Sequence, residues 1–225
     1  ECEDQLYERG FTLIFGNFSS IGMDDWKTRH KKGVQGICIS NWSRLDIPHM
    51  QRNRILIGLA LSSMMLWNPE YSEKNFIENI TEASDILYRF RNHKTLEGRH
   101  VEIRHAVNLR NEHGPFVDGH FIDLKKDYLG EYVITYMNGE KDTVPLYYGL
   151  NIGCIDGRWE LIPSNRPRNV ANEFDGHILE PSYTCRIEKL GGKTLYTLAV
   201  PLKAEAESID LITDLDKSLF EWEVL

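Results

Sequence analysis

The chain has 225 residues, of which 41% are hydrophobic and 27% charged, and its formal net charge is -8. This length and composition are typical of a globular protein with one large domain or two small ones. The acidic balance disfavours a nucleic-acid partner. Phosphate binding needs a basic face, and the short pairs Lys31-Lys32 and Lys125-Lys126 do not make one.

The cysteines and histidines indicate neither a disulfide framework nor a metal site. Cys2, Cys38, Cys154 and Cys185 are scattered, and the eight histidines lack metal-ligand spacing. We therefore expect a reducing, cytoplasmic location and no cofactor. The longest apolar run, 55–67, is shorter than the roughly 20 residues of a membrane span. We therefore expect no membrane partner. No signal peptide opens the chain, and because it lacks an initiator Met we expect a product of a longer protein.

The first 45 residues read as helix, strand, helix, strand. The charged stretch Glu1–Gly10 predicts a helix, and Phe11–Phe15 is a dense apolar strand. A short helix follows from Asp24 to Gly33, and Val34–Ile39 is a second buried strand. This order predicts two parallel strands joined by a crossover helix. Because parallel strands need neighbours on both sides, either a missing N-terminal portion or a second chain must complete the sheet.

Two helices come next. Asp46-Ile47-Pro48 is typical of a helix start, and the following run to Trp67 is apolar nearly all round, which predicts burial on several sides. Ser72 can cap a second helix. Its apolar residues recur on one predicted core face, namely Phe76, Ile80, Ala83, Leu87 and Phe90. The pair predicts an antiparallel helical hairpin.

From about His93 the hydrophobic period changes to two. About seven short strands separated by turns predict an antiparallel β-sandwich. Asn138-Gly139 predicts a tight hairpin, and Pro145 an edge strand or a bulge. We thus expect an α+β protein with a first part at 1–93 and a sandwich domain at 94–225.

Candidate site residues gather just after the second strand, in Ser40-Asn41-Trp42-Ser43. Residues beyond the carboxyl end of a parallel strand face the ligand crevice, where Trp42 could offer a sugar platform. The alternative is that Trp42 fills the core beneath the next helix. The acidic pair Asp24-Asp25 fits helix capping better than catalysis, as does Asp46. Trp159 and Trp222 could form a second sugar platform, but their alternating context favours the core.

Several of these runs resemble the last βα units of family 20 glycoside hydrolases, which are β-N-acetylhexosaminidases built on a TIM barrel. The resemblance covers roughly residues 1–70. It rests on 6–11, on the strand ending Gly16-Asn17, and on 36–42 followed by an apolar helix that ends at Leu66-Trp67-Asn68-Pro69. In that family a Trp after the last barrel strand lines the pocket for the terminal sugar, and Trp42 matches it. The resemblance implies that Asn17, Asn41 and Trp42 bind carbohydrate.

Two departures limit what the chain itself can do. The family usually has an acidic residue two positions after that Trp, where this chain has Arg44. The family's catalytic Asp-Glu pair belongs to an earlier strand, and no such pair precedes residue 36. We therefore expect the chain to be the C-terminal part of a glycoside hydrolase with a TIM-like barrel, which acts on terminal N-acetylhexosamine or a related sugar. The barrel is incomplete in this chain, and the chain carries no catalytic residue of its own. The alternatives are a non-catalytic carbohydrate- or protein-binding module, or a scaffold domain.

Overall fold

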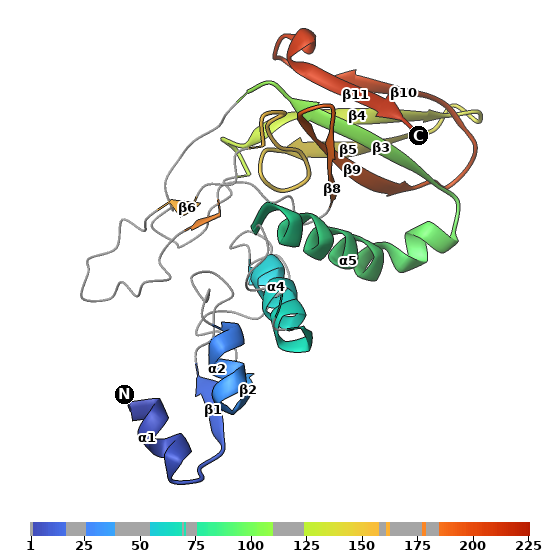
Figure 1. Ribbon diagram of the computed structural model, residues 1–225. Helices are drawn as coiled ribbons and strands as arrows, with labels where there is room; N and C mark the ends of the chain where they lie inside the picture. The colour runs from blue at the N-terminus through green and yellow to red at the C-terminus, as the bar shows by residue number, and fades with distance from the viewer. Residues whose placement is uncertain are drawn as a thin grey trace.

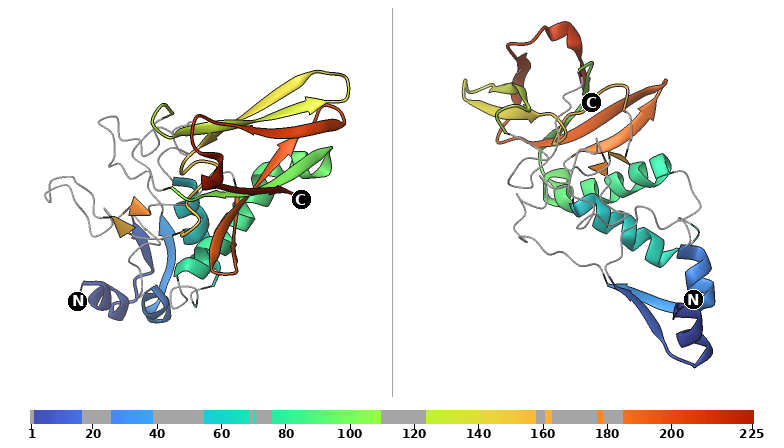
Figure 2. Two further views of the ribbon diagram at one scale, coloured as in Figure 1. Left: turned by 90° about the horizontal axis from the view of Figure 1, so that it is seen from above. Right: turned by 90° about the vertical axis from the view of Figure 1, so that its left-hand side faces the viewer.

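A computed structural model describes residues 2–16, 26–38, 55–68, 70, 76–109, 124–157, 161–162, 177–178 and 185–225. Within these residues the chain is an α+β protein whose α-helices precede its larger antiparallel sheets. Figures 1 and 2 show three tiers: residues 2–38 at one end, the helices of 55–97 in the middle and the larger sheets at the other end.

The first tier contains the predicted parallel pair. Its elements are α1 (Cys2–Glu8), β1 (Leu13–Gly16), α2 (Trp26–Lys32) and β2 (Val34–Cys38). Strands β1 and β2 pair in parallel, with Ile14 opposite Gly36 and Gly16 opposite Cys38. The prediction of neighbouring parallel strands is therefore confirmed. In the described part of the chain, neither strand pairs with a third.

Helix α1 ends where the Arg9-Gly10 signal predicts. The amide of Gly10 donates to the Tyr7 carbonyl at 2.9 Å, and the amide of Phe11 donates to the Leu6 carbonyl at 3.1 Å. These two bonds form a Schellman motif, which satisfies the last helical carbonyls and turns the chain into β1.

Trp26 joins the first tier to the second. Its side chain is only 1% exposed, and its indole Nε1 donates a hydrogen bond of 2.9 Å to the carbonyl of Met65. Lys27 adds an ion pair with Glu70 beside it. One buried aromatic side chain from α2 thus fixes the βαβ unit against the next helix.

The predicted helical pair is present as α4 (Ile55–Trp67) and α5 (Phe76–Glu97), which pack against each other. Two expectations about burial are wrong. Trp67 is 92% exposed and Phe90 is 77% exposed, although both were expected in the core. Helix α5 also continues four residues past His93, because 94–97 carry no Gly or Pro to end it and Gly98 is the first breaker.

The predicted number of sandwich strands is confirmed. Seven strands form a three-stranded sheet of order β10-β4-β5 and a four-stranded sheet of order β11-β3-β9-β8, both antiparallel. Their bounds are β3 (His100–Val107), β4 (Tyr128–Tyr136), β5 (Lys141–Tyr147), β8 (Arg186–Leu190), β9 (Lys193–Pro201), β10 (Ala206–Ile212) and β11 (Phe220–Val224). Strand β5, which carries Pro145, is an edge strand as expected.

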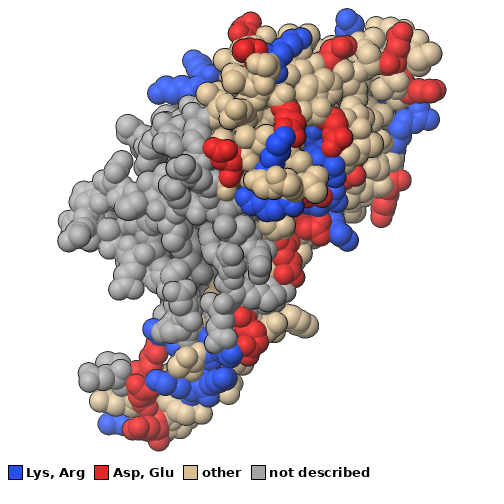
Figure 3. Space-filling model, turned by 45° about the horizontal axis from the view of Figure 1, so that its top comes forward, with Lys and Arg blue, Asp and Glu red and all other residues tan. Residues whose placement is uncertain are grey.

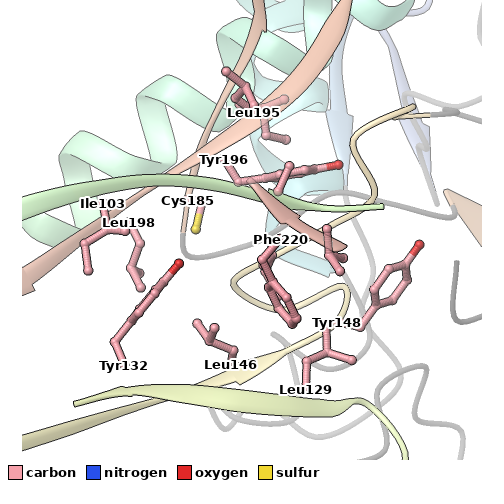
Figure 4. Close-up of a cluster of buried hydrophobic side chains, with 14 of the residues drawn as sticks. Ile103, Leu129, Tyr132, Leu146, Tyr148, Cys185, Leu195, Tyr196, Leu198 and Phe220 are labelled. Atoms are coloured by element: carbon pink, nitrogen blue, oxygen red, sulfur yellow. The ribbon is translucent and has the colours of Figure 1, made fainter. Parts of the chain in front are cut away.

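The two sheets share one hydrophobic core. Figure 4 shows Tyr132 and Leu146 of the three-stranded sheet directed toward Ile103 and Leu198 of the four-stranded sheet. All four side chains are buried. This face-to-face packing of alternating apolar side chains is the arrangement of a β-sandwich.

Helix α5 covers the opposite face of the four-stranded sheet (Figure 1). The hydroxyl of Ser84 donates to the Thr81 carbonyl at 2.7 Å and accepts the amide of Ile187 at 3.1 Å. The helix thereby provides an acceptor for the Ile187 amide of the edge strand β8. Without Ser84 this amide would be buried with no hydrogen-bond partner.

The predicted loop from Pro163 to Gly176 lies outside the described residues, and the residues that flank it form a short antiparallel pair, β6 (Leu161–Ile162) and β7 (His177–Ile178). A single turn of 3₁₀ helix, η2 (Lys217–Leu219), precedes β11. The predicted helix starts at Asp46 and Ser72 lie outside the described residues. Among the described helices, none is both long and apolar enough to span a membrane.

Candidate functional site

The carboxyl ends of β1 and β2 lie side by side, because the parallel register places Gly16 opposite Cys38. Asn17 is the next residue after Gly16, and Asn41 and Trp42 follow Cys38 by three and four positions. In parallel sheets, residues that follow neighbouring strands in this way meet at one edge of the sheet. The described strands therefore bring together the two chain segments that lead to the predicted site residues.

The predicted residues themselves lie outside the described part of the chain. This holds for Asn17, Asn41 and Trp42, and equally for the acidic residues Asp24, Asp25 and Asp46. Trp159, half of the second predicted platform, is also outside it. The proposed pocket wall thus remains a prediction from sequence.

Trp222, the other half of that platform, belongs to the sandwich core. It is half-buried, and its ring centroid lies 5.3 Å from that of Tyr132 on the facing sheet. The alternating pattern favoured a core position for Trp222, and this is confirmed. The side of Trp222 that faces the other sheet is packed against Tyr132.

A fully buried hydrogen-bond network lies next to Tyr132. The two ring nitrogens of His105 lie 2.9 Å from the Tyr132 hydroxyl and 2.7 Å from the Asn151 carbonyl. Since a carbonyl only accepts, Nε2 carries the proton and Nδ1 accepts from Tyr132. The Cys185 thiol donates to the same Asn151 carbonyl. Both ring nitrogens are hydrogen-bonded, so this buried cluster ties His105 of β3 to Tyr132 of β4 on the facing sheet.

A cleft of about 680 Å³ opens between α5 and β8, and its volume is in the usual range for small-ligand sites. Its lining is strongly charged. The charged lining residues are Glu82, Asp85 and Arg89 from α5 and Arg186, Glu188 and Lys189 from β8. Asp85 and Arg89 pair within the helix at 2.9 Å.

Glu188 is the centre of the charge network beside this cleft. It accepts a hydrogen bond of 2.9 Å from Thr197 and faces Arg104 at 3.3 Å and Arg186 at 3.6 Å. Burial raises the pKa of the Glu188 carboxyl, but the Thr197 hydrogen bond and the two arginines outweigh it, so the net pKa lies below its usual value. Glu188 is therefore ionised at neutral pH.

Arg186 lies over the ring of Tyr88, 5.7 Å from its centroid, in a cation–π arrangement. Burial and a hydrogen bond to Glu102 raise the pKa of the Tyr88 hydroxyl, which stays protonated. The Arg186 Nε is buried without a hydrogen-bond partner. Sequence reasoning missed this cleft, because its residues come from elements about a hundred positions apart and no motif links them.

Among the described residues, no three His, Cys, Asp or Glu side chains come together as metal ligands. On the face shown in Figure 3, positive and negative side chains are interspersed over the described surface. The described residues thus form no candidate metal centre, and on this face they form no broad patch of positive or of negative charge.

The fold defines the chain as an α+β protein that carries a small parallel βαβ unit and two packed antiparallel sheets. No family model, no curated protein and no solved structure matches the chain.

Proposed function

We propose that this chain is the C-terminal part of a family 20-like glycoside hydrolase that acts on terminal N-acetylhexosamine or a related sugar. In this proposal, β1 and β2 are the last strands of a TIM-like barrel, and Asn17, Asn41 and Trp42 line the sugar pocket. The observation that carries the proposal is the parallel β1–β2 pair with its carboxyl ends in register.

The chemistry divides between this chain and polypeptide outside it. In the resembled family, a Glu acts as the acid, and an Asp orients the acetamido group of the substrate, whose oxygen attacks. No Asp-Glu pair precedes residue 36 here. The chain would therefore supply part of the pocket wall, with Trp42 stacking against the apolar face of the sugar and Asn17 and Asn41 binding its hydroxyls.

Nuclear magnetic resonance of the tryptophan indole N–H groups tests sugar binding directly. Trp42→Phe assigns the Trp42 signal among the five tryptophans of the chain. N-acetylglucosamine should shift that signal in a saturable manner, and glucose, which lacks the acetamido group, should shift it less. Trp67→Phe is the matched control, because Trp67 is 92% exposed and belongs to no proposed site. A Trp42 signal that does not respond to the sugar contradicts the proposal.

An activity assay tests whether the catalytic acids lie outside these 225 residues. The 225-residue chain should not turn over a chromogenic N-acetylglucosaminide. Turnover that appears in the chain and disappears in Trp42→Ala would mean that the catalytic acids lie within these residues, which contradicts their assignment to other polypeptide.

A non-catalytic binding module is the second candidate, and the cleft between α5 and β8 is the observation that favours it. In this alternative the sandwich and its helix bind a glycan or a protein, and the βαβ unit has no ligand. A glycan array probed with Arg186→Ala and with Trp42→Ala separates the two candidates. Loss of binding in Arg186→Ala alone favours the module, and loss in Trp42→Ala alone favours the barrel enzyme.

A further inference from the structure

The charges that line the cleft between α5 and β8 are balanced in number but not equally well paired. The lining contains three basic residues, Arg89, Arg186 and Lys189, and three acidic residues, Glu82, Asp85 and Glu188. Asp85 and Arg89 form an ion pair at 2.9 Å on the helix side of the cleft. On the strand side, Glu188 and Arg186 lie farther apart, at 3.6 Å.

Glu188 supplies Arg186 with an opposite charge but not with a hydrogen bond. The Oε2 atom of Glu188 accepts from the Thr197 hydroxyl at 2.9 Å and from the Nε of Arg104 at 3.3 Å. These two donors occupy the two lone pairs of that oxygen. The Nη2 of Arg186 is 3.6 Å from the same atom, which is beyond hydrogen-bond distance. Glu188 therefore leaves hydrogen-bonding capacity of the Arg186 guanidinium unused.

The other contacts of Arg186 hold its guanidinium in place. The guanidinium lies 5.7 Å from the ring centroid of Tyr88, which is 2% exposed and donates its hydroxyl hydrogen to Glu102. The Arg186 Nε is buried and has no acceptor among the described residues, although the side chain as a whole is 26% exposed to the cleft side and solvent. A guanidinium that has lost hydration without gaining acceptors is stabilised when an anion provides them.

We propose that this cleft binds a small organic acid through a single carboxylate, which accepts hydrogen bonds from the Nη groups of Arg186. The planar fork of guanidinium donors matches the geometry of a carboxylate. A singly charged ligand fits the lining better than a dianion such as phosphate, because Glu82 and Asp85 in the same cleft repel negative charge. The cleft volume of about 680 Å³ leaves room for the body of the ligand beyond its carboxylate.

This inference rests on the second candidate function, because it names the ligand class of the cleft, and it is independent of the sugar pocket proposed at Trp42. Two kinds of small molecule carry such a carboxylate. One is an acidic sugar, for which glucuronate is the probe, and the other is an acylated amino acid, for which N-acetylalanine is the probe. Glucose and N-acetylalanine amide are the matched neutral molecules, since they keep the body of each probe and lack its carboxylate.

Nuclear magnetic resonance of the arginine Nε–H groups in the 225-residue chain tests the proposal. Arg186→Lys assigns the Arg186 signal by removing it. At least one of the two acids should shift this signal in a saturable manner, with a Kd of about 1 mM or tighter, as expected for a small ligand held by one charged pair. Glucose and N-acetylalanine amide should leave the signal in place, and inorganic phosphate should bind more weakly than the acid.

Three variants, compared by isothermal titration calorimetry, separate the fork of Arg186 from general charge. Arg186→Lys keeps the positive charge but loses the planar fork, so it should weaken binding of the acid at least about tenfold. Arg89→Lys is the matched control, because Arg89 lines the same cleft and is already paired with Asp85; it should change the affinity less than about threefold. Asp85→Asn removes a repelling charge and should tighten binding about threefold or more, a gain that misfolding cannot produce.

Binding of glucuronate alone would identify an acidic sugar, and binding of N-acetylalanine alone an acylated amino acid; either result, or both, supports the inference. The inference is overturned if neither acid binds, if the neutral molecules or phosphate bind as tightly, or if Arg186→Lys leaves the affinity unchanged. Weaker binding in Asp85→Asn would also overturn it. If the acids fail to bind while Arg186→Ala still abolishes binding on the glycan array, the inference is wrong and the second candidate function stands.

Discussion

His105 lies between the two sheets with both ring nitrogens hydrogen-bonded and no measurable exposure. Burial lowers its pKa to about 4, and the hydrogen bond to the Asn151 carbonyl opposes this only in part. The folded protein therefore holds His105 neutral, whereas an unfolded chain protonates histidine near pH 6.5.

This shift predicts a pH dependence of stability with a definite sign. Because the folded pKa lies below the unfolded one, the contribution of His105 is complete above pH 6.5 and is lost as the pH falls toward 4. Between pH 7 and 4.5, wild type should lose roughly 2–3 kcal/mol more unfolding free energy than His105→Gln. Urea titrations at the two pH values measure this difference. An equal loss in both proteins would mean that His105 does not titrate in this way.

The second prediction for a single side chain concerns the contribution of Trp26 to stability. Trp26→Phe keeps most of the apolar surface but removes the Nε1 donor to the Met65 carbonyl. The loss should be about 1–2 kcal/mol of unfolding free energy. Trp67→Phe, at a side chain 92% exposed, should change it by less than about 0.5 kcal/mol. Urea unfolding followed by circular dichroism compares them, and equal effects would contradict the role of Trp26 as an anchor.

Within the three-stranded sheet, two glycines have different reasons for being glycine. Gly139 completes the β4–β5 hairpin with φ +80°, and a Cβ there would meet open space. Gly130 has φ +137° at an irregularity of β4, and a Cβ there would lie 2.4 Å from the Ile212 carbonyl oxygen. That oxygen belongs to the backbone of β10, so it can move only with the strand.

Alanine substitutions should separate these two roles. Gly139→Ala adds only the strain of a left-handed residue, about 1 kcal/mol. Gly130→Ala adds a clash that pushes β10 away from β4 and should cost at least about 3 kcal/mol. Thermal unfolding ranks the variants, and hydrogen exchange in β10 should rise only in Gly130→Ala. Equal destabilisation would show that φ alone matters at both positions.

At the level of secondary-structure elements, the local signals in the sequence were accurate. The Arg9-Gly10 stop, the Asn138-Gly139 hairpin and the seven strand patterns all have counterparts in the structure. The face of α5 was predicted less well. Ala83 is fully buried and Phe90 is 77% exposed, because the face of the helix that packs on β8 carries Ala83, Ser84 and Tyr88, and Phe90 lies outside that face.

Buried hydrophobic residues are unevenly distributed over the described part of the molecule. The buried cluster and the side chains packed on it extend from Ala60 to Trp222, and no described residue of the first tier belongs to it. The βαβ unit depends on Trp26, on Val34 and on exposed ion pairs such as Lys32 with Asp4, and such pairs contribute little.

We therefore predict that the first tier opens before the sandwich. In hydrogen exchange of the 225-residue chain, the amides of β1 and β2 should exchange through local opening, at least about tenfold faster than those of β3 and β9. Mass spectrometry of peptides from 13–38 and 100–107 measures this. Uniform protection across the two tiers would contradict it.

The candidate site was only partly accessible from sequence. The strand pair that leads to Asn17 and Trp42 could be predicted, because parallel βαβ order follows from short apolar runs and one crossover helix. The cleft at Arg186 and Glu188 could not, since α5 and β8 are far apart in the sequence and only their packing creates the concavity.

The sequence by itself determined which described segments form helices and strands and where they turn, because these depend on local periodicity and turn chemistry. Only the tertiary structure decided which faces are covered. Trp26 and His105 are buried, whereas Trp67, Phe90 and Ile14 are exposed. Burial depends on which elements meet in space, and no local pattern encodes that.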